Sequence, residues 1–414
     1  MARRTRNSGS PALASSARGA LERDFERFER ELPRDFPAHV RQTYRIDLAA
    51  RYLGEPIVHP IGKGSGQLSL NAAQLEDDAT AGLAFAVLKT VIAEDETGAQ
   101  AMAAWAIHES KMAVERRPAG DGRVGWTVTW KGRGWDRPLA DYLALVRTAR
   151  DLTRAGRLLV VPSVKYHLPR LDESFRDTEY RHTTGRLAEA WGAPPLLVEK
   201  DFSPTLAGDP LADDRAQILR WLREVPTRIR AASPIPVRVA VKLMNARFDD
   251  RFQIEMMDAC TGANALVVFN RLFDAERGVA YGGCDLSDRN LRVLDLLPRS
   301  PGSRPGSAHP LTPHARAGLP ALTGTGNICS GGLILDYARR GCESVQLHTF
   351  FQLPQSEYPA THGSRTARAL HALVFHPQHG LIAGMLALEE RGELARRGGE
   401  LHFLDVGSDA HRAG

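Results

Sequence analysis

Near the end of the chain, a short apolar run, Pro320–Leu322, leads into a cluster of four glycines: Gly324, Gly326, Gly331 and Gly332. A helical repeat of apolar residues begins directly after them, at Leu333. Glycines between a strand end and a helix start let backbone N–H groups converge on an anion. In a β/α barrel, the loops after the last two strands often hold a phosphate. The cluster therefore predicts a phosphate-binding turn, although a tight turn without a ligand would use the same glycines.

Three polar residues interrupt or end strongly apolar β-type runs. Lys242 lies within VAVKLM, where an ammonium must find an anion or lose its hydration at high cost. Lys89 ends a run, and an ammonium there can hold a carboxylate or an electron-rich ring edge. Asn270 also ends a run, and its amide both donates and accepts, which suits an imide- or amide-like ligand. A buried structural ion pair, a solvated lysine and a turn asparagine are the structural alternatives.

The elements that must position these residues form a regular series. Eight β-type runs are found: Pro56–Gly62, Phe85–Val91, Leu158–Val164, Leu196–Phe202, Val237–Leu243, Ala265–Asn270, Pro320–Gly324 and Ser344–Thr349. Helical patterns lie between most of them: Ala72–Ala81, Leu139–Ala155, Glu179–Trp191, Asp213–Ala231, Phe252–Cys260 and Leu333–Arg340. Continuous apolar runs are typical of parallel strands buried on both faces. Eight such strands alternating with helices predict an α/β fold, a (β/α)8 TIM barrel.

The remaining segments flank or interrupt this series. Residues 1–18 contain arginines and no acid, which favours a disordered basic tail over a targeting peptide. Residues 19–44 show an amphipathic helical pattern, expected to pack outside a barrel that spans 45–390, with 391–414 as a C-terminal tail. The alternating run Trp126–Lys131 predicts a hairpin strand on top of the barrel, and Pro298–Gly318 an irregular loop.

Composition excludes several classes of protein. In 414 residues, 43% are hydrophobic and 25% charged, as in soluble globular proteins, and no apolar run approaches the ~20 residues of a membrane span. The four cysteines lack CxxC or metal-like spacing, which indicates free thiols in a reducing cytoplasm and argues against an iron–sulfur cluster. The histidines show no metal spacing either. We expect a cytoplasmic protein with a small-molecule substrate, no metal and no nucleic-acid partner, with homodimerisation left open.

The chain resembles the dihydroorotate dehydrogenase family of FMN-dependent barrels, which is related to the dehydrogenase domain of dihydropyrimidine dehydrogenase. The resemblance covers roughly Asp47 to Leu353 and is carried by the order and spacing of several motifs: RYLGEPIVHPIG, AGLAFAVLKTV, FSP at Phe202–Pro204, VAVKLMN, ALVVFN and GTGNICSGG…GCESVQLHT. It implies an oxidoreductase that acts on a C–C bond of a small polar, perhaps pyrimidine-like ring.

The resemblance also implies roles for individual residues. Lys89 and Lys242 would contact the flavin, and Lys89 and Asn270 the substrate. The FMN phosphate would be surrounded by the turn and the strand that follows it, with these residues: Gly324, Gly326, Asn327, Gly331 and Thr349. Ser203 falls where the family keeps its proton-transfer residue, so it would take the substrate proton while hydride passes to the flavin. An ordinary Ser-Pro turn is the alternative for Ser203.

The chain departs from the family around the substrate. Lys200 and Thr205 replace two of the asparagines that surround dihydroorotate in the family, and a third position falls near Thr129. Lys200 and Thr205 are then expected to contact a different substrate, because a pocket built for hydrogen bonding discriminates strongly when its partners change. Two further functions stay open: a phosphate-binding lyase or isomerase without flavin, using Lys89 or Lys242 as an imine-forming amine, and a non-catalytic barrel. The electron acceptor is not indicated.

Overall fold

The computed structural model describes residues 11–103, 112–118, 124–130, 134–202, 214–246, 248–270, 272–274, 279–281, 284–297 and 319–407. Ten short strands form its main sheet, and every neighbouring pair in it is parallel. Their order is β6 (Val91–Ile92), β10 (Ser163–Lys165), β11 (Leu196–Asp201), β12 (Val237–Met244), β13 (Ala265–Asn270), β16 (Ala321–Thr325), β17 (Cys342–Leu347), β4 (Ile61–Lys63), β5 (Phe85–Val87) and β9 (Leu159–Val161).

This sheet closes into a ring of eight strands. The segments 85–92 and 159–165 are each interrupted once, so that each appears twice in the order. β5 pairs with β9 through Phe85 and Leu159, and β6 pairs with β10 through Val91 and Val164. The same two segments therefore stand at both ends of the strand order. The predicted (β/α)8 barrel is confirmed.

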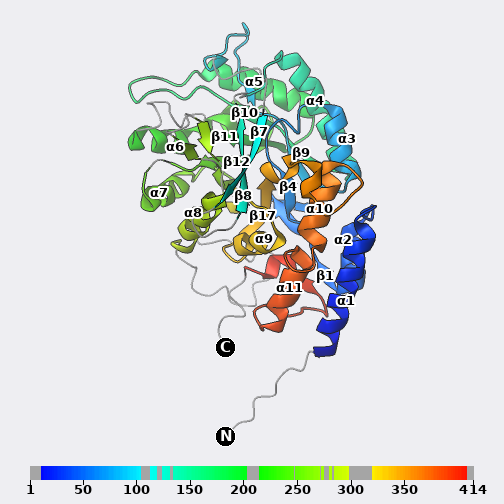
Figure 1. The fold of residues 1–414 in the computed structure, drawn as a ribbon. Coiled ribbons are helices and arrows are strands. Elements are labelled where there is room, and N and C mark those ends of the chain that lie inside the picture. The colour runs from blue at the N-terminus through cyan, green and yellow to red at the C-terminus, as the bar shows by residue number, and fades with distance from the viewer. Residues whose placement is uncertain are drawn as a thin grey trace.

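Helices cover the outside of the ring (Figure 1). Those of the barrel are α3 (Ala72–Thr80), α4 (Leu139–Arg154), α5 (Asp177–Trp191), α6 (Arg215–Ala232), α7 (Asp250–Ala259), α8 (Cys284–Asp295), α9 (Gly331–Ala338), α10 (Arg365–Phe375) and α11 (Leu381–Glu390). In α4 the buried residues recur every three to four positions, as in Leu139, Tyr142, Val146 and Ala149, which gives the helix one apolar face toward the strands. The sequence did not predict α8, α10 and α11.

The N-terminal extension consists of two helices rather than one. α1 (Pro11–Phe28) begins inside the segment that the sequence assigned to a disordered tail, and α2 (Phe36–Tyr44) follows after a break. The break contains Pro33, and Asp35 caps α2 by accepting a hydrogen bond from the N–H of Ala38 at 3.1 Å. α1 lies along α10 and α11 (Figure 1), so the extension packs outside the barrel as expected.

Side chains seal the end of the barrel where the strands begin. Tyr52, from β2 (Ala50–Tyr52), stacks on Phe85 with ring centroids 4.1 Å apart, and β3 (Glu55–Ile57) completes that hairpin. A Cβ atom on Gly62 would lie 2.2 Å from the Phe85 ring, so only glycine fits there. Nearby, β1 (Ile46–Asp47) pairs with β18 (Leu401–His402), which shows that part of the predicted C-terminal tail returns to the barrel. The open end is therefore the one where the strands finish.

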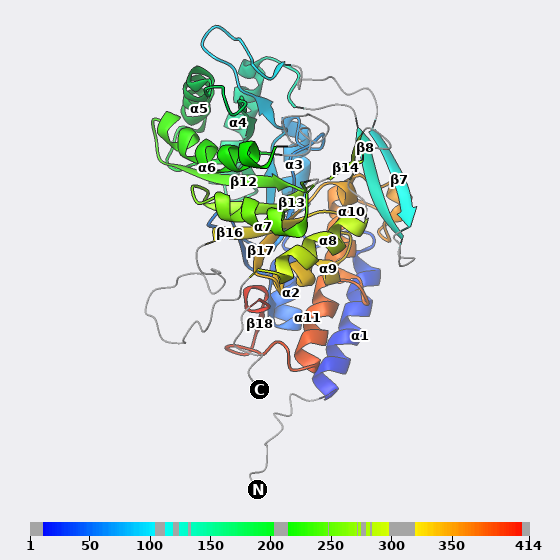
Figure 2. The same ribbon diagram turned by 90° about the vertical axis from the view of Figure 1, so that its left-hand side faces the viewer.

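A hairpin of β7 (Met112–Pro118) and β8 (Val124–Trp130) lies at that open end. It contacts β15 (Val279–Tyr281), which pairs with β14 (Leu272–Asp274), and it also contacts α8 and η4 (Thr349–Gln352) (Figure 2). Arg116 of the hairpin forms an ion pair with Glu357 of η5 (Gln355–Glu357) at 3.3 Å. The expected hairpin strand on top of the barrel is thus present. The expected loop 298–318 lies outside the described residues, and η6 (Phe403–Asp405) follows β18.

No helix in the described ranges is long and apolar enough to cross a membrane. Those residues also contain no cluster of three or more histidine, cysteine or acidic side chains suited to a metal ion. Among the described residues, Cys260, Cys329 and Cys342 form no disulfide bond.

Candidate active site

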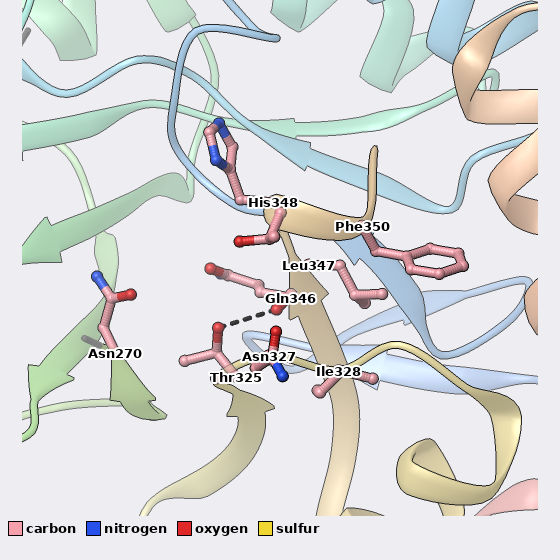
Figure 3. Close-up of a pocket in the computed structure, with 10 residues that line it drawn as sticks. Asn270, Thr325, Asn327, Ile328, Gln346, Leu347, His348 and Phe350 are labelled. Atoms are coloured by element: carbon pink, nitrogen blue, oxygen red, sulfur yellow. Dashed lines mark hydrogen bonds between the residues drawn. The ribbon is translucent and has the colours of Figure 1, made fainter. Parts of the chain in front are cut away.

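A pocket opens where β16 and β17 end, at the place that the glycine turn predicted. It is lined by Asn270, Thr325, Gly326, Asn327, Ile328, Gln346, Leu347, His348, Thr349 and Phe350. In Figure 3, Asn270 projects from the end of β13 on one side and Phe350 stands on the other. The Thr325 hydroxyl donates to the Gln346 carbonyl at 2.9 Å, which ties the two strand ends together. The structure thus brings four predicted ligand residues to one pocket: Asn270, Gly326, Asn327 and Thr349.

Of the predicted phosphate glycines, Gly326 alone lines this pocket. Its φ of 111° belongs to the region that favours glycine, and Asn327 beside it has a φ of 51°. Gly324 instead leaves room for the Tyr337 ring to pack against the backbone, because a Cβ there would lie 2.4 Å from that ring. Gly331 leaves room for the backbone at the start of α11 to pack closely, because a Cβ there would lie 2.0 Å from the nitrogen of Leu381. Gly324 and Gly331 therefore serve packing in this fold.

The N-terminus of α9 offers fewer free amides than the sequence suggested. The N–H of Gly332 donates to the carbonyl of His379 at 3.2 Å. The N–H of Leu333 donates to the hydroxyl of Ser330, the N-cap residue, at 3.1 Å. In contrast, the N–H of Ile328 donates to no other described residue. The N–H of Gly326 follows the Thr325–Gln346 pair and faces β17. The turn before the helix, rather than the helix itself, is equipped to bind an anion.

Lys242 lies inside the barrel and next to a carboxylate. Its Nζ is 3.9 Å from Oε1 of Glu199, a fully buried side chain that the sequence analysis did not single out. Glu199 also accepts from the Tyr52 hydroxyl at 2.9 Å and from the Gln346 amide at 2.5 Å. Burial raises the pKa of Glu199, and the Lys242 ammonium opposes that shift. The acid would have been recognisable in the sequence as a polar residue inside an apolar strand.

A second polar group joins the strand ends on the other side of the mouth. The Thr90 hydroxyl lies 2.9 Å from the Ser65 hydroxyl and 3.0 Å from the Ser163 hydroxyl, and it donates to Asp201 Oδ2 at 3.4 Å. Asp201 stands opposite Lys242 in the register of β11 and β12. Lys89 lies at this mouth as predicted and is 7% exposed. It directly precedes Thr90 in the chain.

Lys200 has a different position from the one that the sequence implied. It is fully buried, and because strand residues alternate, it faces away from Glu199 on β11. Its Nζ donates to the carbonyl of Asp201 at 2.9 Å and lies 4.3 Å from the centroid of the Phe202 ring. Burial and the nearby Lys165 lower the pKa of Lys200 to about 7. Lys200 does not line the pocket beside Asn270.

Ser203 and Thr205 lie outside the described residues, so their predicted roles stay predictions. Thr129 belongs to β8, which contacts α8 and η4. Its segment therefore lies at the end of the barrel where the pocket opens.

Two buried asparagines that the sequence analysis missed lie beside Asn270. The Asn245 amide donates to the Asn270 carbonyl at 2.6 Å and to Asn290 Oδ1 at 3.1 Å. Asn245 directly follows β12, a position that could have marked it, whereas Asn290 lies on α8, which had no sequence signal. Asn245 and Asn290 hold the strand ends behind Asn270 and are not among the residues that line the pocket.

A separate cavity of about 400 Å³ lies outside the ring, between α3 and α10. Lys63, on its wall, forms a buried ion pair with Asp78 and donates to Thr366 at 3.0 Å. Burial raises the pKa of Asp78, and Lys63 opposes the shift. This lysine is occupied by structural partners.

The residues at the open end fit FMN. A phosphate requires converging donors, and the pocket offers the N–H of Ile328 and the hydroxyl of Thr349. The reduced flavin ring carries negative charge, and Lys242 lies in the barrel interior with its Nζ 3.9 Å from Glu199 Oε1. A Cβ on Gly64 would lie 3.4 Å from Lys242 Nζ, so the glycine leaves space directly over the ammonium.

The comparisons with known proteins support the fold. No family model matches the chain, and no curated protein matches its sequence. Among solved structures, the fold is similar to that of a dihydroorotate dehydrogenase from Eimeria tenella in complex with ferulenol. The TM-score is 0.57 and the identity 14%, and the match covers 90% of this chain and 96% of that chain. At this identity the likeness establishes a shared barrel architecture.

Proposed function

We propose that the protein is an FMN-dependent oxidoreductase that acts on a C–C bond of a small polar, dihydroorotate- or dihydropyrimidine-like ring. The observation that carries this proposal is the pocket at the ends of β16 and β17, which Gly326, Asn327 and Thr349 line and where the Ile328 N–H donates to no other described residue. Its location agrees with the phosphate sites of β/α barrels. The similarity to a dihydroorotate dehydrogenase barrel is the second support.

When bound, FMN would accept or deliver a hydride at its ring, which is chemistry that no side chain can supply. Gly326, Asn327 and Thr349 would hold its phosphate. Lys242 would face the ring, where positive charge favours the reduced form. The ammonium would keep this position because Glu199 lies behind it.

The substrate would lie against the same mouth. Lys89 would bind an acidic group of the substrate, and the Asn270 amide would form hydrogen bonds with an amide or imide group of the substrate. Ser203 would remove the proton from the carbon next to the one that loses hydride. Lys200 and Thr205 would shape the loop around the substrate, with Lys200 acting from behind the strand rather than by direct contact.

One spectrum tests the proposal. Purified protein should be yellow, with absorbance near ~450 nm, and should release FMN in stoichiometric amount on denaturation. Colourless protein that also fails to bind added FMN would contradict the proposal and favour a lyase or isomerase. Yellow protein that no candidate ring compound bleaches under anaerobic conditions would indicate a non-catalytic flavin-binding barrel.

A further inference from the structure

Asn290 joins the ends of two barrel strands from the outside. It lies fully buried on α8, and its Nδ2 donates to the carbonyl of Phe269 at 2.9 Å and to the carbonyl of Thr325 at 2.8 Å. These carbonyls belong to the residues just before Asn270 and Gly326, both of which line the pocket. One amide therefore fixes the places where β13 and β16 enter the site.

The orientation of this amide is determined by its partners. Backbone carbonyls only accept, so the atom that approaches both of them must be the nitrogen, which also lies 3.1 Å from the Tyr337 hydroxyl. On the other side, Oδ1 accepts from the Asn245 amide at 3.1 Å. The Tyr337 hydroxyl also donates to the Thr325 carbonyl, at 2.8 Å. The Thr325 carbonyl is thus held by two buried donors.

Holding this carbonyl also aims the next amide. In a trans peptide the C=O of one residue and the N–H of the following residue point in opposite directions. With the Thr325 carbonyl turned toward Asn290, the Gly326 N–H points to the other side, toward β17, where Thr325 pairs with Gln346. The contact is close, because a Cβ on Gly326 would lie 2.3 Å from Asn290 Nδ2. Gly326 is therefore required by Asn290 as well as by its own φ of 111°.

We propose that Asn290 is a positioning residue of the phosphate-binding turn, which fixes the backbone of Thr325 and Gly326 in the wall of the pocket that would hold the phosphate of the bound nucleotide. This inference rests on the proposed function. Its specific consequence is that Asn290 contributes to the preference for a phosphorylated flavin over the same flavin without phosphate. A residue that only stabilised the fold would not change that preference.

The test compares the affinities of the apoprotein for FMN and for riboflavin, by fluorescence titration. In Asn290→Ala, FMN affinity should fall roughly tenfold or more, as expected for losing an aligned hydrogen bond to a charged group, while riboflavin affinity changes less than about twofold. Gln253→Ala is the matched control. Gln253 is also fully buried, and from α7 its amide holds the carbonyl of Met244 at 2.8 Å, at the end of β12 and away from the turn. Its FMN to riboflavin ratio should equal that of the parent.

A second variant covers the case in which Asn290→Ala does not fold. Tyr337→Phe removes the second donor to the Thr325 carbonyl, a hydroxyl that also contacts Asn290 Nδ2, and should lower the FMN to riboflavin ratio by a few-fold. An unchanged ratio in the folded variants would overturn the role of Asn290 and leave the flavin function standing. A parent protein that binds neither flavin would overturn both proposals.

Discussion

The Nζ atom of Lys242 and the Oε1 atom of Glu199 face each other at 3.9 Å inside the barrel, and both side chains are buried. This distance leaves a long ion pair rather than a direct hydrogen bond. Glu199 has its own donors in Tyr52 and Gln346. The ion pair therefore holds the Lys242 ammonium near the mouth of the barrel but neutralises its charge only in part.

Lys242→Met should make stability depend more steeply on pH. Burial already raises the pKa of Glu199, and the variant removes the ammonium that opposes the shift. A raised carboxyl pKa means that the folded state favours the protonated form, so stability is present at low pH and lost as pH rises through the folded pKa. Between about pH 5 and about pH 8, the free energy of unfolding should fall more in Lys242→Met than in the parent, as measured by urea denaturation.

The double variant Lys242→Met/Glu199→Gln provides the control for that experiment. It removes the titrating group, so it should regain stability at about pH 8 relative to Lys242→Met. If the single and double variants show the same pH dependence, the two side chains are not coupled.

Gly326→Ala should greatly weaken FMN retention. The substitution places a Cβ 2.3 Å from Asn290 Nδ2 and 3.0 Å from the Phe269 carbonyl, at a φ that side chains rarely adopt. Gly332→Ala is a suitable control, because the nearest atom to its Cβ would be the Ser330 hydroxyl at 3.8 Å. FMN content after gel filtration distinguishes them. Equal FMN content in both variants would contradict the assignment of the FMN phosphate to this turn.

Ser203→Ala should leave FMN bound and slow flavin reduction by the true substrate roughly 10²–10⁴-fold, the usual contribution of a positioned general base. Ser203→Cys should retain part of the rate, because a thiol titrates nearer neutrality. Anaerobic stopped-flow reduction of the three proteins across pH is the measurement. An alanine variant within about threefold of the parent would make Ser203 a turn residue and point to Asp201, whose carboxylate accepts from Thr90 at the same mouth.

Dihydroorotate should reduce the flavin slowly or not at all. The positions that resemble the family's substrate asparagines hold Thr129, Lys200 and Thr205, and the buried Lys200 directs its ammonium to the Asp201 carbonyl. A site that loses its hydrogen-bonding partners discriminates against the former ligand. Anaerobic mixing followed at the flavin absorbance band provides the measurement. Rapid bleaching at micromolar dihydroorotate would show that these changes do not affect substrate choice.

His59 should make the fold sensitive to acid. Burial lowers its pKa from 6.5 to about 4, while its Nε2 lies 2.8 Å from the carbonyl of Gly82. A histidine whose folded pKa is depressed binds protons more readily when unfolded, so stability falls as pH drops below about 6.5 and continues to fall until the folded pKa is reached. From about pH 7.5 to about pH 5, the loss attributable to His59 should be about 2 kcal/mol.

Urea denaturation at the two pH values measures this loss, and His59→Gln should show a smaller difference between them. Two other buried histidines, His167 and His371, also have lowered pKa values, so the comparison with the variant isolates the contribution of His59. An identical pH dependence in parent and variant would contradict the assignment.

The sequence by itself determined the barrel and predicted where its candidate site lies. Eight apolar runs predicted eight parallel strands, because strands buried on both faces need apolar residues throughout. The helices that separate them were visible through their amphipathic repeats, as in α4 and α6. Glycines at a strand end predicted a ligand turn, because the backbone conformation of Gly326 is one that few other residues adopt.

Only the tertiary structure decided which polar residues share the site. Gly324 and Gly331 look like Gly326 in the sequence. In the structure, however, Gly324 packs against the Tyr337 ring and Gly331 against the backbone of Leu381, and only the tertiary structure brings these neighbours close. The motif that contains Lys200 predicted a contact with the substrate. Because side chains alternate along β11, however, the Lys200 side chain lies on the opposite face of the strand from Glu199. Asn290 lies 35 residues from the Thr325 carbonyl that it holds. Such contacts are created by strand register and helix packing between distant segments, which no local pattern encodes.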